Sequence, residues 1–285
     1  NISPYYDDFN ADYNFYKVLF NPGRPIQARE LTTLQSILQD QVEKFGSNIF
    51  KNGSCVIPGN VTFDSNFYAV KLNSSLFGVD ITSYIDQLVG KKLTGQVSGV
   101  TATVQTYVLP DNDQVVYPTI YVKYNGPDNN NQINPFQDGE TLLSYDANIV
   151  YNGITIASGT PLASLIQTNA TAIGSAASIS KGVYFIRGYF VTVPDQTILL
   201  DYYTNTPTYR VGLKITEDLI TSYDDATLYD NAKGFTNYAA PGADRLKITL
   251  TLVKKSITDF NDTDFVEILR TKKVSTVVNG VTVDK

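Results

Sequence analysis

Residues 92–124 read KLTGQVSGVTATVQTYVLPDNDQVVYPTIYVKY, and this stretch is the clearest guide to the fold. Polar and apolar side chains alternate along most of it, which is the period-two pattern of a strand with one buried face. Turn residues, Ser98-Gly99 and Asp111-Asn112-Asp113, divide it into segments. The segments predicted as strands are 92–97, 101–109 and 115–124. The pattern predicts a compact β-module.

Strand-like segments recur on both sides of this module, separated by Gly, Asn, Asp and Pro. They are 54–63, 67–72, 149–156, 182–193, 197–203, 209–215, 246–253 and 274–283, the last built around Asn279-Gly280. We expect 149–156 to return the chain to its main body. Residues 158–179, rich in Ala, Ser, Thr and Gly, fit either a loop or a weak helix, and 223–243 is irregular.

One long helix is predicted from Gln27 to about Phe45, because Pro25 precedes it and Gly46 follows it. A second, short helix is predicted from Asp80, whose carboxylate is a suitable cap. The sequence therefore predicts a mainly β (α+β) protein, with short-strand β-domains, one long N-terminal helix and an inserted small β-module.

Apolar side chains recur along the long helix at the 3-4-3-4 spacing of a coiled-coil seam. The seam positions are Leu31, Leu34, Leu38, Gln41 and Phe45, with Ile37 and Val42 beside them. The other face carries Thr, Gln and Ser with few charges, which is unusual for a solvated helix. Two alternatives follow: the helix packs only onto its own β-domain, or it has a second buried surface against a partner.

The predicted domain boundaries follow from changes in residue pattern along the chain. Residues 1–26 are rich in aromatic side chains without a clear period, which predicts an extended arm. The predicted parts are 1–26 (arm), 27–75 (helix and first strands), 76–158 (inserted module), 159–255 (remainder of the main β-domain) and 256–285 (C-terminal strands leading to further chain). The absence of Met and the start at Asn1 indicate a section of a longer protein.

Composition excludes several classes of function. The chain of 285 residues has 22 basic and 28 acidic side chains, and 22 − 28 gives a net charge of −6. This net negative charge argues against a groove that binds nucleic acid, because such a groove needs clustered basic side chains. With no His and one Cys, imidazole catalysis and clustered zinc or iron–sulfur sites are excluded. No apolar run is long enough to span a membrane.

The acidic clusters are weak candidates for chemistry. In Asp259-x-Asn261-x-Thr263 a calcium loop begins acceptably, but its sixth position is Asp264 instead of Gly. The pairs Asp7-Asp8, Asp111/Asp113 and Asp224-Asp225 stand in turn-like contexts, where Asp usually caps backbone amides. Cys55 in a strand-like run is expected to be a small buried hydrophobe. We therefore expect no catalytic residues, no metal and no cofactor.

Four stretches carry a resemblance to a known group of proteins. They are PYYDDF (4–9), YKVLFNPGRPIQARELTTLQSILQ (16–39), FGSNIFKNGS (45–54) and LYDNAKGFTNYAAPGADRLKI (228–248). These stretches resemble baseplate and tail-fibre structural proteins of tailed bacteriophages, common in marine and cyanobacterial contractile-tailed phages. The resemblance covers 4–62 and 182–255, and it is most specific at Arg24, Gln27, Arg29, Glu30 and Leu31.

The resemblance implies a non-enzymatic virion protein, made in the host cytoplasm, whose N-terminal region docks a tail fibre or wedge component to the baseplate. Phage appendages of this kind are often trimers, so the expected partners are further copies of the chain and other baseplate or tail proteins. The candidate interface residues are Tyr5, Tyr6, Phe9, Tyr16, Arg24, Arg29, Leu31, Leu34, Gln35, Leu38, Gln41 and Phe45.

Two other functions remain open at this point. The inserted module is a candidate for binding a host-surface glycan, through Tyr117, Tyr121, Tyr124 and the Asn129–Asn131 loop. A tail-associated depolymerase is the weaker of the two, because the sequence shows no β-helix repeat.

Overall fold

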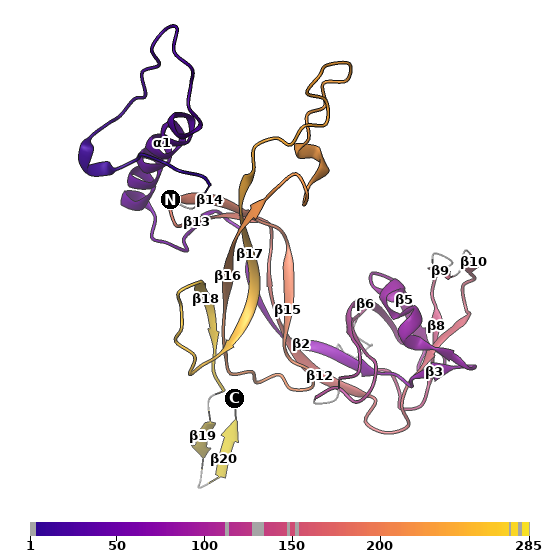
Figure 1. Cartoon of the computed structure of the whole chain (residues 1–285). Coiled ribbons are helices and arrows are strands. Elements are labelled where there is room, and N and C mark those ends of the chain that lie inside the picture. The colour runs from indigo at the N-terminus through magenta and orange to yellow at the C-terminus, as the bar shows by residue number, and fades with distance from the viewer. Residues whose placement is uncertain are drawn as a thin grey trace. The chain divides into compact units, whose positions relative to one another are not determined.

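The computed structural model describes residues 4–111, 114–126, 134–146, 149–151, 154–273, 275–278 and 281–284. The fold is mainly β with one long α-helix among these residues, which confirms the predicted fold class. The chain forms two compact units (Figure 1). Unit 1 comprises Asn1–Val61, Ser178–Gln196 and Arg210–Arg270, and unit 2 comprises Thr62–Ala177, Thr197–Tyr209 and Thr271–Lys285.

Unit 1 holds the arm, the long helix and two small sheets. Its elements are η1 (Ala11–Tyr13), α1 (Ala28–Ile49), β1 (Cys55–Ile57), β13 (Gly182–Ile186), β14 (Tyr189–Val193), β16 (Tyr209–Ile220), η4 (Ala226–Leu228), β17 (Arg245–Ser256) and β18 (Phe265–Thr271). One sheet has the order β1-β13-β14, with antiparallel pairs, and the other has the order β17-β16-β18. In Figure 1 the arm runs as a wide loop beside α1.

The helix α1 starts as predicted and ends later. At its start the Glu30 carboxylate accepts a hydrogen bond from the Gln27 N–H at 2.8 Å, which satisfies one of the free backbone donors. It then continues through Gly46 to Ile49. A Cβ at Gly46 would lie 2.4 Å from Cε2 of Phe185, so this glycine permits close packing and does not stop the helix. The predicted end near Phe45 is therefore wrong.

The hairpin of β13 and β14 is the platform on which α1 rests. Its turn residues Arg187 and Gly188 both have positive φ, 48° and 84°, as tight hairpin turns require. Phe185 and Phe190 on the hairpin pack against each other at a ring-centroid distance of 5.2 Å, and each lies 6.0 Å from Phe50, which follows α1, in tilted or edge-to-face geometry. These three rings fix the C-terminal end of the helix.

Unit 2 is built on one large sheet, in the order β11-β8-β5-β6-β7-β2-β12-β15. Its elements are β2 (Val61–Lys71), β3 (Ser75–Leu76), β4 (Val79–Asp80), η2 (Ile81–Ser83), η3 (Ile85–Leu88), β5 (Lys92–Gly95), β6 (Thr101–Val108), β7 (Thr119–Tyr124), β8 (Thr141–Ser144), β9 (Ile149–Tyr151), β10 (Ile154–Ile156), β11 (Pro161–Ser164), β12 (Thr171–Ile179), β15 (Gln196–Asp201), β19 (Ser275–Val278) and β20 (Val281–Asp284). The three strands predicted from residues 92–124 are β5, β6 and β7, and they are consecutive in this sheet.

The core of unit 2 lies where two 3-10 turns pack against the sheet. Asp80 caps η2 by accepting a hydrogen bond from the Thr82 N–H at 2.9 Å, so the predicted short helix begins where expected but forms η2 and η3. Ile81, Ile85 and Leu88 on these turns are buried with Leu93 of β5. Burial of this apolar side supplies the main stabilisation of unit 2.

Residues 158–179 form β11 and β12 joined by a short irregular connection, so the helix alternative is wrong and the loop alternative holds only between the strands. Small side chains are needed in β12 because neighbouring groups approach closely. A Cβ at Gly174 would lie 2.8 Å from the carbonyl oxygen of Tyr202 and 3.2 Å from the ring of Tyr121. Low charge and small residues here mark a buried strand in close contact with its neighbours.

The predicted module boundaries also differ from those of unit 2. Because β2 pairs with β7, and β12 and β15 continue the same sheet, unit 2 extends beyond 76–158 on both sides. Segment 149–156 forms the hairpin β9–β10 and does not return to the main body. The single strand expected over 54–63 is divided between β1 and β2. The hairpin β19–β20 is present, while its turn residues Asn279 and Gly280 lie outside the described residues.

Candidate docking surface on the helix and arm

The arm is attached to α1 by hydrogen bonds. Asp7 accepts them from the hydroxyl of Thr33 at 2.9 Å, from the hydroxyl of Ser36 and from the Phe9 N–H at 2.8 Å. Partial burial opposes ionisation of Asp7, but these donors outweigh it and lower the pKa of its carboxyl. Charged Asp7 therefore holds the arm on the polar face of the helix.

Two further contacts connect the arm to the rest of unit 1. The Tyr5 hydroxyl donates a hydrogen bond to Asp244, which raises the pKa of the tyrosine. The Arg29 side chain lies 3.4 Å from Asp8, as an exposed ion pair that adds little stability. The arm is thus connected both to α1 and to the segment before β17.

A second face of α1 packs onto the β13–β14 hairpin. The Gln39 side chain donates a hydrogen bond to the Gly188 carbonyl at 2.8 Å, and Gly46 lies against the Phe185 ring. On the arm side of α1, Ile37 is only 3% exposed, one helical turn after Thr33. The protein therefore buries the helix through these two faces.

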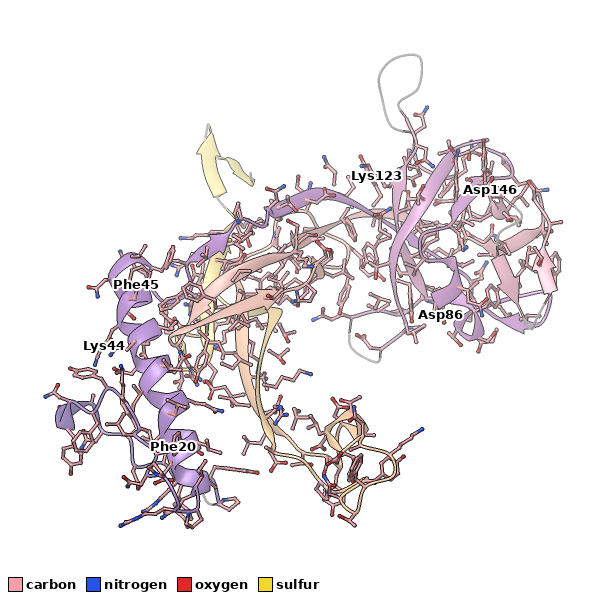
Figure 2. All side chains as sticks on the ribbon, turned by 90° about the horizontal axis from the view of Figure 1, so that it is seen from above. Phe20, Lys44, Phe45, Asp86, Lys123 and Asp146 are labelled. Atoms are coloured by element: carbon pink, nitrogen blue, oxygen red, sulfur yellow. The ribbon has the colours of Figure 1, made fainter. Side chains whose placement is uncertain are left out.

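A third face of α1 is apolar and exposed. We define the apolar stripe as Leu31, Leu38, Val42, Phe45 and Ile49. The exposed fractions of Leu38, Phe45 and Ile49 are 60%, 68% and 57%. Figure 2 labels Phe45 on this helix, beside Lys44, and Phe20 in the arm. Among the residues described, α1 contacts its own β-unit through a different face. Of the predicted seam, Leu31, Leu38, Gln41 and Phe45 remain exposed, whereas Leu34 is half-buried.

The stripe is large for a surface in contact with water only. If a fully exposed apolar side chain offers about 150–200 Å², the five residues leave roughly 500 Å² of apolar surface uncovered. Monomeric proteins rarely expose contiguous apolar patches beyond a few hundred Å². Patches of this size commonly mark an interaction site.

The other predicted interface residues are divided between buried and exposed positions. Tyr5 and Phe9 are half-buried, whereas Tyr6 and Tyr16 are exposed. On the helix Leu34 is half-buried; Gln35 and Gln41 are exposed, as are Arg24 and Arg29. Sequence reasoning missed Ile49, because the helix was expected to end at Phe45.

The acidic group near residue 260 surrounds a buried arginine. Arg210 on β16 is 3% exposed and forms ion pairs with Asp262 at 2.6 Å and Glu267 at 2.5 Å. Asp264 pairs instead with Arg187. Within the described part of the chain, no cluster of side chains has the composition of a metal site. These carboxylates are therefore engaged in ion pairs that join the 259–267 segment to the sheet.

Other candidates from the sequence have structural roles or different environments. Asp224 and Asp225 accept hydrogen bonds from the backbone of Thr221 and Thr227, as expected for capping residues. Asp111 likewise caps the Gln114 N–H, while Asp113 lies outside the described residues.

Cys55 is exposed and not buried as expected, because it stands on the edge strand β1.

Tyr121 and Tyr124, proposed for glycan contact, are both buried, so they offer no ring to a sugar. Tyr117 is exposed, and Asn129–Asn131 lie outside the described residues.

In the part of the chain that is described, no helix has the length and apolar character needed to cross a membrane.

Comparison with known proteins identifies one family. The model of a domain of unknown function, DUF4815, matches residues 3–104 and 139–281. The unmatched residues 105–138 include β7, which lies between β6 and β2 in the large sheet of unit 2. No curated protein and no solved structure gives a significant match. Because the match covers most of its length, the chain belongs to the DUF4815 family.

Proposed function

We propose that this protein is a non-enzymatic structural component of a phage tail, located in the virion. Its N-terminal region would dock a tail fibre or wedge component to the baseplate and associate with further copies of the chain, as a homotrimer. The observation that carries the proposal is the apolar stripe on α1, which is exposed although the helix is anchored on two other faces.

The roles of the other candidate residues support assembly in preference to chemistry. The carboxylate groups that sequence analysis considered for metal binding or catalysis are used in ion pairs and turn caps. The arm adds exposed rings at Tyr6 and Tyr16 next to the helix, which suits contact with another protein. The resemblance of residues 4–62 and 182–255 to phage baseplate proteins gives the biological setting, and the trimer rests on that resemblance.

Self-association is tested by measuring the mass of the purified protein by light scattering over a dilution series. We expect a mass of three chains at micromolar concentration. A single-chain mass of 31.4 kDa throughout would overturn the proposed assembly. The variant Leu31→Asp/Leu38→Asp should be monomeric and folded, because both side chains are exposed in the single chain.

Location is tested by immunogold labelling of purified phage particles with an antibody raised against the intact protein. We expect gold at the tail. Absence of the protein from purified particles would contradict the virion role even if the protein is a trimer. A glycan array with the same preparation tests the alternative receptor function, for which Tyr117 is the exposed candidate ring.

A further inference from the structure

The apolar stripe has heptad spacing, which has consequences for the partner and its direction. Leu31, Leu38 and Phe45 repeat every seven residues. Val42 lies four residues after Leu38, and Ile49 lies four residues after Phe45. We propose that copies of this chain associate through α1 in parallel and in register, with Gln35 of one copy meeting Gln35 of the next. This proposal rests on the proposed function, because it specifies how the copies of that assembly meet.

The heptad positions follow from exposure. Leu31, Leu38 and Phe45 take position d, while Gln35, Val42 and Ile49 take position a, and all six are exposed in the single chain. The charged side chains of the helix are Arg29, Glu30, Asp40, Glu43 and Lys44. In this register every one of them lies at b, c or f, away from the seam. The six a and d positions are therefore uncharged. Their mean spacing of 3.5 residues allows them to pack against the same positions of a second copy of the helix.

Gln35 is the single polar residue among these six a and d positions, and it discriminates between the two directions. In a parallel, in-register pair equal residues face each other, so each Gln35 amide has an amide partner that can both donate and accept hydrogen bonds. In an antiparallel pair centred on the stripe, residue 35 faces residue 45. Gln35 would then be buried against Phe45 without a hydrogen-bond partner, which is unfavourable. The parallel arrangement satisfies the amide and keeps the apolar layers together.

The size of the stripe fits a second copy as the occupant. About 500 Å² of exposed apolar side chain compares with about 800 Å² per partner in a stable interface. Gln41 and Asn48, exposed at the flanking g positions, supply further contact area without charge repulsion. Parallel alignment is also the arrangement that three-fold symmetry requires, since equal helices then surround one axis.

Cysteine cross-linking tests the direction in the full chain, in a Cys55→Ser background that removes the native thiol. Leu31→Cys and Ile49→Cys mark the two ends of the stripe, 18 residues or about 27 Å apart along the helix. In the parallel register each variant alone should form a disulfide-linked dimer under mild oxidation, seen on a non-reducing gel. Lys44→Cys, exposed at position c, is the matched control and should stay uncross-linked.

The outcomes separate this inference from the proposed function. If neither variant cross-links alone but a mixture of the two does, the helices are antiparallel and the inference is wrong, although the chain still assembles. If light scattering shows an oligomer and no combination cross-links, the stripe is not the contact between copies. A monomer by light scattering would remove both the inference and the proposed assembly.

Discussion

Leu38 and its neighbour Ile37 provide a sharp test, because they are adjacent in sequence but belong to different faces of α1. Leu38 is 60% exposed and Ile37 is 3% exposed in the single chain. We expect Leu38→Ser to weaken association without unfolding the protein. Ile37→Ala should instead destabilise the fold, because it removes buried apolar atoms and leaves a cavity.

The expected sizes follow from the exposed areas. About 60% of a leucine side chain, roughly 100 Å², becomes buried in an interface, which at about 25 cal/mol per Å² is roughly 2.5 kcal/mol for each copy. Leu38→Ser should therefore raise the dissociation constant at least about 100-fold. Its effect on the free energy of unfolding of the monomer should stay within about 0.5 kcal/mol. For Ile37→Ala the loss of unfolding free energy should be about 2–5 kcal/mol.

Light scattering over a dilution series measures association, and urea denaturation at a concentration where the protein is monomeric measures the free energy of unfolding. Val97→Ser is the control, since Val97 is 70% exposed on a turn of unit 2. It should change neither quantity. If Leu38→Ser lowered the unfolding free energy as much as Ile37→Ala while the mass stayed unchanged, the stripe would be an internal contact and our reasoning would be refuted.

Four other predictions concern the contacts that shape unit 1. Arg210→Met should lower the melting temperature by roughly 6–12 °C in calorimetry, because it leaves two carboxylates without their buried partner. The free energy of unfolding, measured by urea titration, should fall as pH falls from about 4.5 towards 2. Hydrogen bonds from Arg270 and then Arg210 lower the pKa of Glu267 to about 2, although its burial opposes this. The charged carboxylate therefore stabilises the fold above this pH range, and the stabilisation is lost as Glu267 is protonated. Gly46→Ala should cost about 1–3 kcal/mol of unfolding free energy, because its Cβ would overlap an aromatic ring. Asp7→Asn should loosen the arm, seen as faster tryptic cleavage after Lys17, which is exposed in the arm.

Each of these predictions has a contradicting outcome. An unchanged melting temperature for Arg210→Met would show that the ion pairs add no net stability. A urea midpoint that stays flat from pH 5 to pH 2 would remove the assigned role of Glu267. Normal stability for Gly46→Ala would mean that the helix can move away from the hairpin at no cost. Equal cleavage rates in wild type and Asp7→Asn would show that other contacts hold the arm.

Local patterns predicted most of the elements correctly. The alternation in 92–124 gave three strands that are neighbours in the large sheet, and the start of α1 was predicted within one residue. Both features depend on side chains close together in sequence. The boundary of unit 2 was not predictable in this way, because it depends on β2 pairing with β7 across about fifty residues.

The errors at Gly46 and in 158–179 share one cause. When only neighbours in sequence are considered, a glycine signals a helix end, and a segment rich in Ala, Ser, Thr and Gly fits a loop or a weak helix. Here Gly46 and Gly174 are required by groups far away in the chain, the ring of Phe185 and the carbonyl of Tyr202. Such close contacts leave no local signal, so the sequence pattern pointed to the wrong structure.

The apolar stripe on α1 likewise has one property set by neighbouring residues and one set by contacts between distant residues. By itself the sequence determined that α1 carries an uncharged seam of Leu31, Leu34, Leu38, Gln41 and Phe45, since heptad spacing is a property of neighbouring residues. It could not determine whether the protein covers that seam itself. The tertiary structure decided this, because the arm and the β13–β14 hairpin hold the helix by its other two faces and leave the apolar stripe exposed.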